Sequence, residues 1–170
     1  MIILSLGTNL KSKYGDRFNN LKYAISFLEN YGISIVKKSS IYETPSYPDE
    51  NNPKFLNIII SIKTNLSPQD LMKILLEIEN KFDRKRINKN DPRTCDIDII
   101  DYNGKILDFN YRDLHLIIPH KELSLRNFVL FPLQEILPHW KHPKTKENIS
   151  DLIEQLTGKN RKAILKIKKN

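Results

Sequence analysis

The 170-residue chain has few of the residues on which several common classes of protein depend. Its single cysteine, Cys95, cannot form a disulfide within the chain, which is typical of a reducing compartment. None of its five glycines lies in a phosphate-binding loop of the Walker or Rossmann type. No zinc-binding spacing joins Cys95 to the four histidines, which are His115, His120, His139 and His142.

Long apolar runs are also missing. No stretch approaches the ~20 apolar residues that cross a bilayer, and the apolar segment 1–6 has no basic leader, so we expect a first strand there. We therefore expect one domain over 1–170, monomeric, cytoplasmic and without a membrane partner. The formal net charge of +8 suits a polyanionic partner, either a polyphosphate or a nucleic acid. The basic residues of 159–170 are interpreted as a solvated end.

The segment 92–100 is the most informative part of the sequence, because it predicts a strand with two carboxylates on one face. Side chains alternate along a strand, so Asp96 and Asp98 point the same way, with Cα atoms ~6.6 Å apart, while Ile97 faces a core. Such a pair is either a solvated edge or a site for one or two Mg²⁺ ions. Nearby basic residues favour the second interpretation, since they can hold phosphate oxygens: Lys81, Arg84, Lys85, Arg86, Lys89 and Arg93.

Two further groups of residues could bind a substrate. Phe55 and Asn57 share one face of a predicted strand, where a ring can stack on a flat heterocycle and an amide can bind its edge. The alternative is that both residues simply belong to the strand. Downstream, His120 and Arg126 could contact phosphate and Phe128 could stack, although a histidine next to proline is more often structural.

The apolar periodicity predicts the order β-α-β-β-α-β, typical of a ferredoxin-like α+β sandwich with helices on one face of an antiparallel sheet and C-terminal additions. Asn103-Gly104 predicts a two-residue turn that pairs 97–102 with 105–108. Gly7-Thr8-Asn9 is expected to end the first strand. The remaining expected elements are strands at 33–42, 55–62 and 163–167, and helices at 18–28, 67–82, 126–137 and 149–156, the last ending at Gly158.

With these residues in hand, the chain resembles the 6-hydroxymethyl-7,8-dihydropterin pyrophosphokinase family over nearly its whole length. The most specific motif is Pro92-Arg93-Thr94-x-Asp96-x-Asp98. The others, in the same order as in the family, are 5–10 (Ser-Leu-Gly-Thr-Asn-Leu), 40–45 (Ser-Ile-Tyr-Glu-Thr-Pro), 55–57 (Phe-Leu-Asn), 118–120 (Ile-Pro-His) and 126–133 (Arg-Asn-Phe-Val-Leu-x-Pro-Leu).

The resemblance implies an enzyme of folate biosynthesis that transfers pyrophosphate from ATP to the pterin hydroxymethyl group and releases AMP. It implies two Mg²⁺ ions on Asp96 and Asp98, and loops at 43–54 and 81–93 that close over ATP. Implied pterin contacts are Thr44, Pro45, Phe55, Asn57 and Phe128. Implied ATP contacts are Glu79, Arg84, Arg86, Arg93, Ile99, His120 and Arg126, with Arg86, Arg93 and Asp98 as catalytic groups. Departures from the family pattern at Leu76, Asn90, Asp91, His115 and Lys121 affect the expected adenine contacts and loop closure.

Two other functions remain open at this level. The net charge of +8 and the strand aromatics suit a ferredoxin-like module that binds RNA, although an acidic pair on the sheet would repel phosphate. The same two carboxylates would also serve a nucleotidyltransferase, which would release pyrophosphate instead of AMP.

Overall fold

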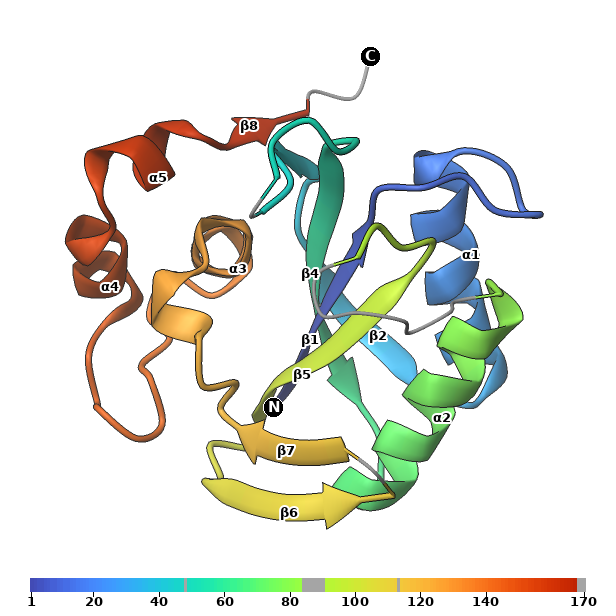
Figure 1. Ribbon diagram of the computed structural model, residues 1–170. Helices are drawn as coiled ribbons and strands as arrows, with labels where there is room; N and C mark the ends of the chain where they lie inside the picture. Colours follow the sequence, from blue (N-terminus) through green and yellow to red (C-terminus); the bar gives the residue numbers. More distant parts are fainter. Residues whose placement is uncertain (48, 84–90, 113, 168–170) are drawn as a thin grey trace.

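The computed structural model describes residues 1–47, 49–83, 91–112 and 114–167. Its main sheet is antiparallel, with β5-β1-β4-β3-β8 in order and β2 paired with β4 beside β3 (Figure 1). The strands are β1 (Ile2–Thr8), β2 (Ser34–Lys38), β3 (Tyr42–Thr44), β4 (Phe55–Lys63), β5 (Asp96–Tyr102) and β8 (Leu165–Lys166). A separate pair is formed by β6 (Leu107–Tyr111) and β7 (Leu114–Ile118).

The helices lie on both faces of this sheet (Figure 1). They are α1 (Arg17–Asn30), α2 (Pro68–Lys81), α3 (Asn127–Ile136), α4 (Ile149–Gln155) and α5 (Gly158–Lys162), with a 3₁₀ turn at Leu123–Leu125. The order β1-α1-β2/β3-β4-α2-β5 confirms the ferredoxin-like α+β prediction. The expected second strand, 33–42, is split, because the Ser39 hydroxyl accepts the Ile59 N–H at 3.0 Å in place of a strand carbonyl.

Strand alternation divides the core into two clusters. Leu56, Ile58 and Ile60 pack toward α1 and α2, whereas Ile59 packs toward α3 and α4. The prediction of helices on one face therefore holds for α1 and α2 only, because the C-terminal helices bury the other face. The start of α2 is as expected: the Ser67 hydroxyl accepts the Asp70 N–H at 3.1 Å.

Several local predictions were wrong. Asn103 and Gly104 do form a tight turn, with φ of 55° and 68°, but no hairpin follows, because β5 pairs with β1 while β6 pairs with β7. β1 continues to Thr8, and Gly158 begins α5 instead of ending α4. Near the C-terminus the expected closing strand is present as β8, which pairs with β3, and the described basic residues Lys159, Arg161, Lys162 and Lys166 are exposed as expected. Within the described ranges, no helix is both long and apolar enough to cross a membrane.

Candidate active site

The two aspartates and Asn57 come together because β1 lies between β5 and β4. In this register Gly7 lies opposite both Asp96 and Asn57, and Ser5 lies opposite Asp98. A Cβ atom on Gly7 would lie 3.2 Å from Asn57 Oδ1 and 3.8 Å from the Phe55 ring. The absence of a side chain at this position thus lets the amide and the ring lie close to the central strand, on the same face as the carboxylates.

Each aspartate is paired with an arginine that also lies over a phenyl ring. Arg93 Nη1 donates to Asp96 Oδ2 at 2.9 Å, and its guanidinium lies 5.4 Å from the Phe55 ring centroid. Arg126 Nη1 donates to Asp98 Oδ2 at 3.3 Å, and its guanidinium lies 5.5 Å from the Phe128 ring. Both side-chain arrangements combine an ion pair with a cation–π contact.

The pose of Arg93 leaves one polar group without compensation. Its Nε is buried and makes no hydrogen bond with the described part of the chain. A buried donor without a partner costs roughly 1–3 kcal/mol of stability. This conformation of Arg93 would therefore be stabilised by an acceptor at Nε. An anionic ligand bound next to Arg93 would supply such acceptors.

His120 lies next to the second arginine and its carboxylates. Burial lowers the pKa of His120, and this effect outweighs the nearby Asp98, which raises it. Nδ1 accepts the Glu122 N–H at 3.1 Å, while the Glu122 carboxylate accepts from Arg126 Nη2 at 2.8 Å. The imidazole is therefore mainly neutral at pH 7, and its Nε2 is left as a hydrogen-bond donor.

The pterin contacts implied by the sequence lie on adjoining strands and on α3. The Asn57 side chain donates to the Thr44 hydroxyl at 3.0 Å, with both residues buried, and Pro45 directly follows Thr44. Phe55 begins β4 and Phe128 lies in the first turn of α3. The structure thus places an amide and two partly exposed rings around the aspartate pair.

The remaining implied ATP contacts are placed differently. Glu79 is 1% exposed, and its Oε1 accepts the Ile97 N–H at 2.8 Å from the α2 side of the sheet. The Ile99 side chain belongs to the core beneath α1 and α2, so only its backbone faces the edge of the site. Arg84 and Arg86, like most of the predicted loop 81–93, lie outside the described residues.

Sequence reasoning assigned no role to Asn9, which organises this end of the sheet. Its Oδ1 accepts the Arg93 N–H at 2.7 Å, and its amide donates to Pro53 O at 3.0 Å and Ser46 Oγ at 3.2 Å. Asn9 thereby joins the backbone at Arg93 to the loop that contains Ser46 and Pro53. The available signal in the sequence was a polar residue directly after an apolar strand, within the 5–10 motif of the family.

The donor set at the aspartate pair suits a hard cation. Among the residues that the structure describes, no group of three or more His, Cys, Asp or Glu side chains could hold a metal by itself. Mg²⁺ commonly takes only one or two carboxylates and completes its shell with phosphate oxygens and water. Asp96 and Asp98 offer that combination on a rigid strand, so the residues present fit Mg²⁺ bound together with a polyphosphate.

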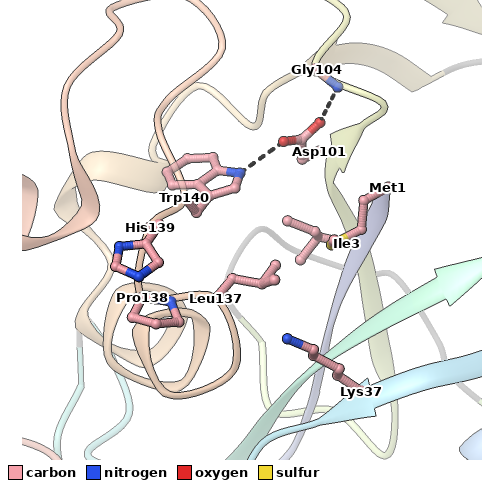
Figure 2. Close-up of a pocket in the computed structure, with 9 residues that line it drawn as sticks. All are labelled: Met1, Ile3, Lys37, Asp101, Gly104, Leu137, Pro138, His139 and Trp140. Atoms are coloured by element: carbon pink, nitrogen blue, oxygen red, sulfur yellow. Dashed lines mark hydrogen bonds between the residues drawn. The ribbon is translucent and has the colours of Figure 1, made fainter.

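Two hollows of the molecular surface lie apart from the aspartate pair. One, of about 370 Å³, lies at the other end of β5 between α3 and the sheet (Figure 2). There, both Asp101 carboxylate oxygens are occupied, by Trp140 Nε1 at 2.8 Å and the Gly104 N–H at 2.7 Å, so Asp101 anchors the indole. The other, of about 690 Å³, is lined by Asn9, Arg17, Glu43 and Lys54 among others. We assign neither hollow a catalytic role.

Comparison with known families identifies this arrangement. The sequence model of the family described as 7,8-dihydro-6-hydroxymethylpterin-pyrophosphokinase (HPPK) matches residues 3–138. The chain belongs to this family. The resemblance on the aspartate motif is therefore confirmed, and the chain is a member of a family of pyrophosphokinases.

Curated HPPK relatives match most of the chain. Proteins called 2-amino-4-hydroxy-6-hydroxymethyldihydropteridine pyrophosphokinase are 37% identical in Synechocystis sp., covering 91% of this chain and 75% of the relative, and 34% identical in Aquifex aeolicus, covering 98% of each. The Bacillus subtilis relative is 38% identical over 78% of this chain and 75% of its own length.

Solved structures support the HPPK fold. The wild-type Plasmodium falciparum HPPK-DHPS has a TM-score of 0.71 at 18% identity, covering 89% of this chain. A variant of the same protein, solved with pterin and p-hydroxybenzoate, has a TM-score of 0.77 at 16% identity, covering 97% of this chain. This chain spans 43% and 46% of those two chains, which are therefore longer.

Proposed function

We propose that this chain transfers the β,γ-pyrophosphoryl group of ATP to the hydroxymethyl group of 6-hydroxymethyl-7,8-dihydropterin, with Mg²⁺, and releases AMP. The observation that carries the proposal is the aspartate pair of β5, in which each carboxylate is paired with an arginine that also lies over a phenyl ring, in a member of the HPPK family. We further infer that residues 1–170 act as one monomeric pyrophosphokinase domain in the cytoplasm, where ATP is supplied for folate biosynthesis.

In this proposal the two rings take the flat pterin between them. Phe55 and Phe128 would contact its faces, and Asn57 with the Thr44–Pro45 segment would bind its edge. Because Arg93 and Arg126 lie over those same rings, a pterin that stacks on the ring faces they cover would displace both guanidinium groups. The displaced arginines then become available to phosphate oxygens, which supports a coupling between pterin binding and phosphate binding.

The reaction would proceed by direct in-line displacement. The hydroxymethyl oxygen would attack the β-phosphorus and lose its proton to solvent, while the bond from that phosphorus to the α-phosphate oxygen breaks and AMP leaves. Mg²⁺ held at the aspartate pair would supply charge neutralisation at the phosphate oxygens. Asp96 and Asp98 would hold the cations, Arg93 and Arg126 would bind the transferred group, and neutral His120 would donate a hydrogen bond to phosphate. Arg84, Arg86 and the Ile99 backbone are proposed ATP contacts, whereas Glu79, which is buried, would act indirectly by holding the Ile97 N–H.

The proposal accounts for the structure better than an RNA-binding module does. Such a module would bind RNA on the open face of its sheet, but here α3 and α4 pack on that face. The part that stays uncovered carries Asp96 and Asp98, which repel phosphate unless a divalent cation is present. The net charge alone does not favour RNA.

The decisive test is incubation with ATP, Mg²⁺ and the hydroxymethyl dihydropterin, with AMP and the pterin diphosphate measured together. We expect the two products in equal amounts, and we expect Asp96→Asn or Asp98→Asn to lower turnover by about 10²–10³-fold in a folded protein. Asp108→Asn is a matched control, because Asp108 is 68% exposed on β6 and pairs with His115.

Three results would contradict the proposal. Release of pyrophosphate in place of AMP would favour nucleotidyl transfer. Near-normal turnover by a folded Asp96→Asn or Asp98→Asn variant would refute the metal assignment. No product with any pterin, together with salt-sensitive RNA binding, would favour the binding module.

A further inference from the structure

The part of the chain beyond the family match returns to the candidate active site. The match ends at residue 138, but α4, α5 and β8 lead back across the molecule to the edge of the main sheet (Figure 1). We call residues 157–167 the C-terminal strap. Its two ends contact the two elements that carry the aromatic and edge-binding residues, α3 and β3.

The first contact is made by Asn127, the first residue of α3, between Arg126 and Phe128. Its side-chain amide donates to Asn160 O at 2.6 Å and, more weakly, to Ala163 O at 3.5 Å. Asn127 is 9% exposed, so this amide is largely removed from water and depends on the strap for its hydrogen bonds.

The start of α3 lacks the local support that the other long helices have. The side chains of Asp16 and Ser67 cap α1 and α2, but Arg126, at the corresponding position of α3, makes no capping hydrogen bond. Its guanidinium instead binds Asp98 and Glu122. The first turn of α3 is thus held from outside, through the amide of Asn127.

The second contact joins the strap to β3. Tyr42 and Glu43 pair with Lys166 and Leu165, and the Ile167 N–H donates to Ile41 O at 2.8 Å. At the far end of α3, Glu135 also contacts both elements, since it accepts from the Tyr42 hydroxyl at 2.9 Å and lies 3.2 Å from Lys166 Nζ. β3 then leads directly to Thr44, the partner of Asn57.

We propose that Asn127 is a positioning residue through which the C-terminal strap fixes the start of α3, and so sets the separation between Phe128 and the β3–β4 wall of the pterin site. The strap ties both walls together, so loosening it moves Phe128 relative to Phe55. The identity of the bound heterocycle rests on the proposed function; the mechanical link does not.

Two variants test this link at different points. Asn127→Ala removes the amide donor, and Ile167→Pro removes the N–H that binds Ile41 O, at a residue that is not itself a proposed ligand contact. For both we expect the KM for the pterin to rise about tenfold and the KM for ATP to rise clearly less, since the start of α3 carries the Phe128 wall of the pterin site but only one of the proposed ATP contacts, Arg126. Asn148→Ala is the matched control, because that amide donates to Asp151 at the surface.

Hydrogen exchange gives a readout independent of activity. The Val129 and Leu130 N–H groups both bind Arg126 O at 3.0 Å, so they report on the first turn of α3. We expect their exchange to accelerate at least about tenfold in Asn127→Ala and Ile167→Pro, with no change at Leu4 in the centre of β1.

Each outcome decides the proposal. Unchanged exchange at Val129 and Leu130 in either folded variant overturns it, as does an equal rise of both KM values, which indicates general destabilisation. If Asn127→Ala does not fold, Ile167→Pro carries the test alone. If the wild-type protein releases no AMP, the proposed function fails, but the exchange measurement still decides whether the strap holds α3.

Discussion

The ion pair between Arg93 and Asp96 predicts that removing the Arg93 charge strengthens metal binding but lowers turnover. In the ligand-free protein the guanidinium occupies a carboxylate that we assign to Mg²⁺, so the cation has to compete with it. Arg93→Met keeps an apolar side chain over the Phe55 ring and removes the charge. We therefore expect divalent cations to bind the nucleotide-free variant more tightly than the wild type.

The size of this effect follows from the geometry. A pair of unit charges at about 4 Å attracts by ~4 kcal/mol at an effective dielectric constant of 20 and by ~1 kcal/mol in water. Arg93 Nη1 and Asp96 Oδ2 are 2.9 Å apart, and the two side chains are 20% and 21% exposed. Because water still reaches the pair and screens it, we take its net attraction as about 1 kcal/mol. A gain of ~1 kcal/mol corresponds to about fivefold tighter binding.

The assay is titration of the nucleotide-free protein with Mn²⁺, followed by electron paramagnetic resonance, because Mn²⁺ takes the same oxygen ligands as Mg²⁺. Turnover should move the other way and fall about 10²-fold, since Arg93 is then missing from the phosphates. Lys13→Met is the control, as Lys13 pairs with exposed Asp83. Unchanged or weaker Mn²⁺ binding by Arg93→Met would refute the competition.

Two further predictions concern the strand face and the histidine. Gly7→Ala should weaken pterin binding about tenfold while changing the free energy of unfolding by less than about 1 kcal/mol, because the new Cβ meets Asn57 Oδ1 at 3.2 Å while the strand gains backbone stability from alanine. Calorimetric titration checks the first and urea unfolding the second; unaltered affinity would contradict the close packing. Burial lowers the pKa of His120, so the unfolded chain binds protons more readily and stability should fall as the pH drops below about 6.5. His120→Gln should remove part of this loss, while His142, whose pKa burial also lowers, keeps contributing to it. Identical pH profiles for the two proteins, from unfolding at pH 5 to 8, would exclude the effect.

Those parts of the fold that depend on local chemistry were predictable from the sequence. Ser67 followed by Pro68 marks the start of α2 because a capping hydroxyl and a fixed φ act within one turn. β4 follows from the alternation of its side chains. The prediction of a hairpin at Asn103–Gly104 was wrong for the opposite reason. The dipeptide determines a turn, but strand pairing depends on distant parts of the chain, and β5 pairs with β1.

In the candidate site, too, the features set within one strand were predictable and those set by the tertiary fold were not. Alternation alone predicts that Asp96 and Asp98 share a face, because that is a property of one strand. The seating of Arg93 on Phe55 and of Arg126 on Phe128 was not predicted, since one pair joins residues 38 positions apart and both depend on how loops approach the sheet. The same holds for Asn9, whose amide connects two loops that meet only in the folded chain.

The hydrogen bond between Glu79 and the Ile97 N–H has a consequence for the behaviour of the chain in crowded solution. β5 is the last strand on its side of the main sheet, and a terminal strand can act as a template for a neighbouring polypeptide. Because the Glu79 side chain from α2 already accepts the Ile97 N–H, this backbone donor is not available to pair with such a neighbour. The buried Glu79 carboxylate thus disfavours edge-to-edge pairing of β5 with another polypeptide.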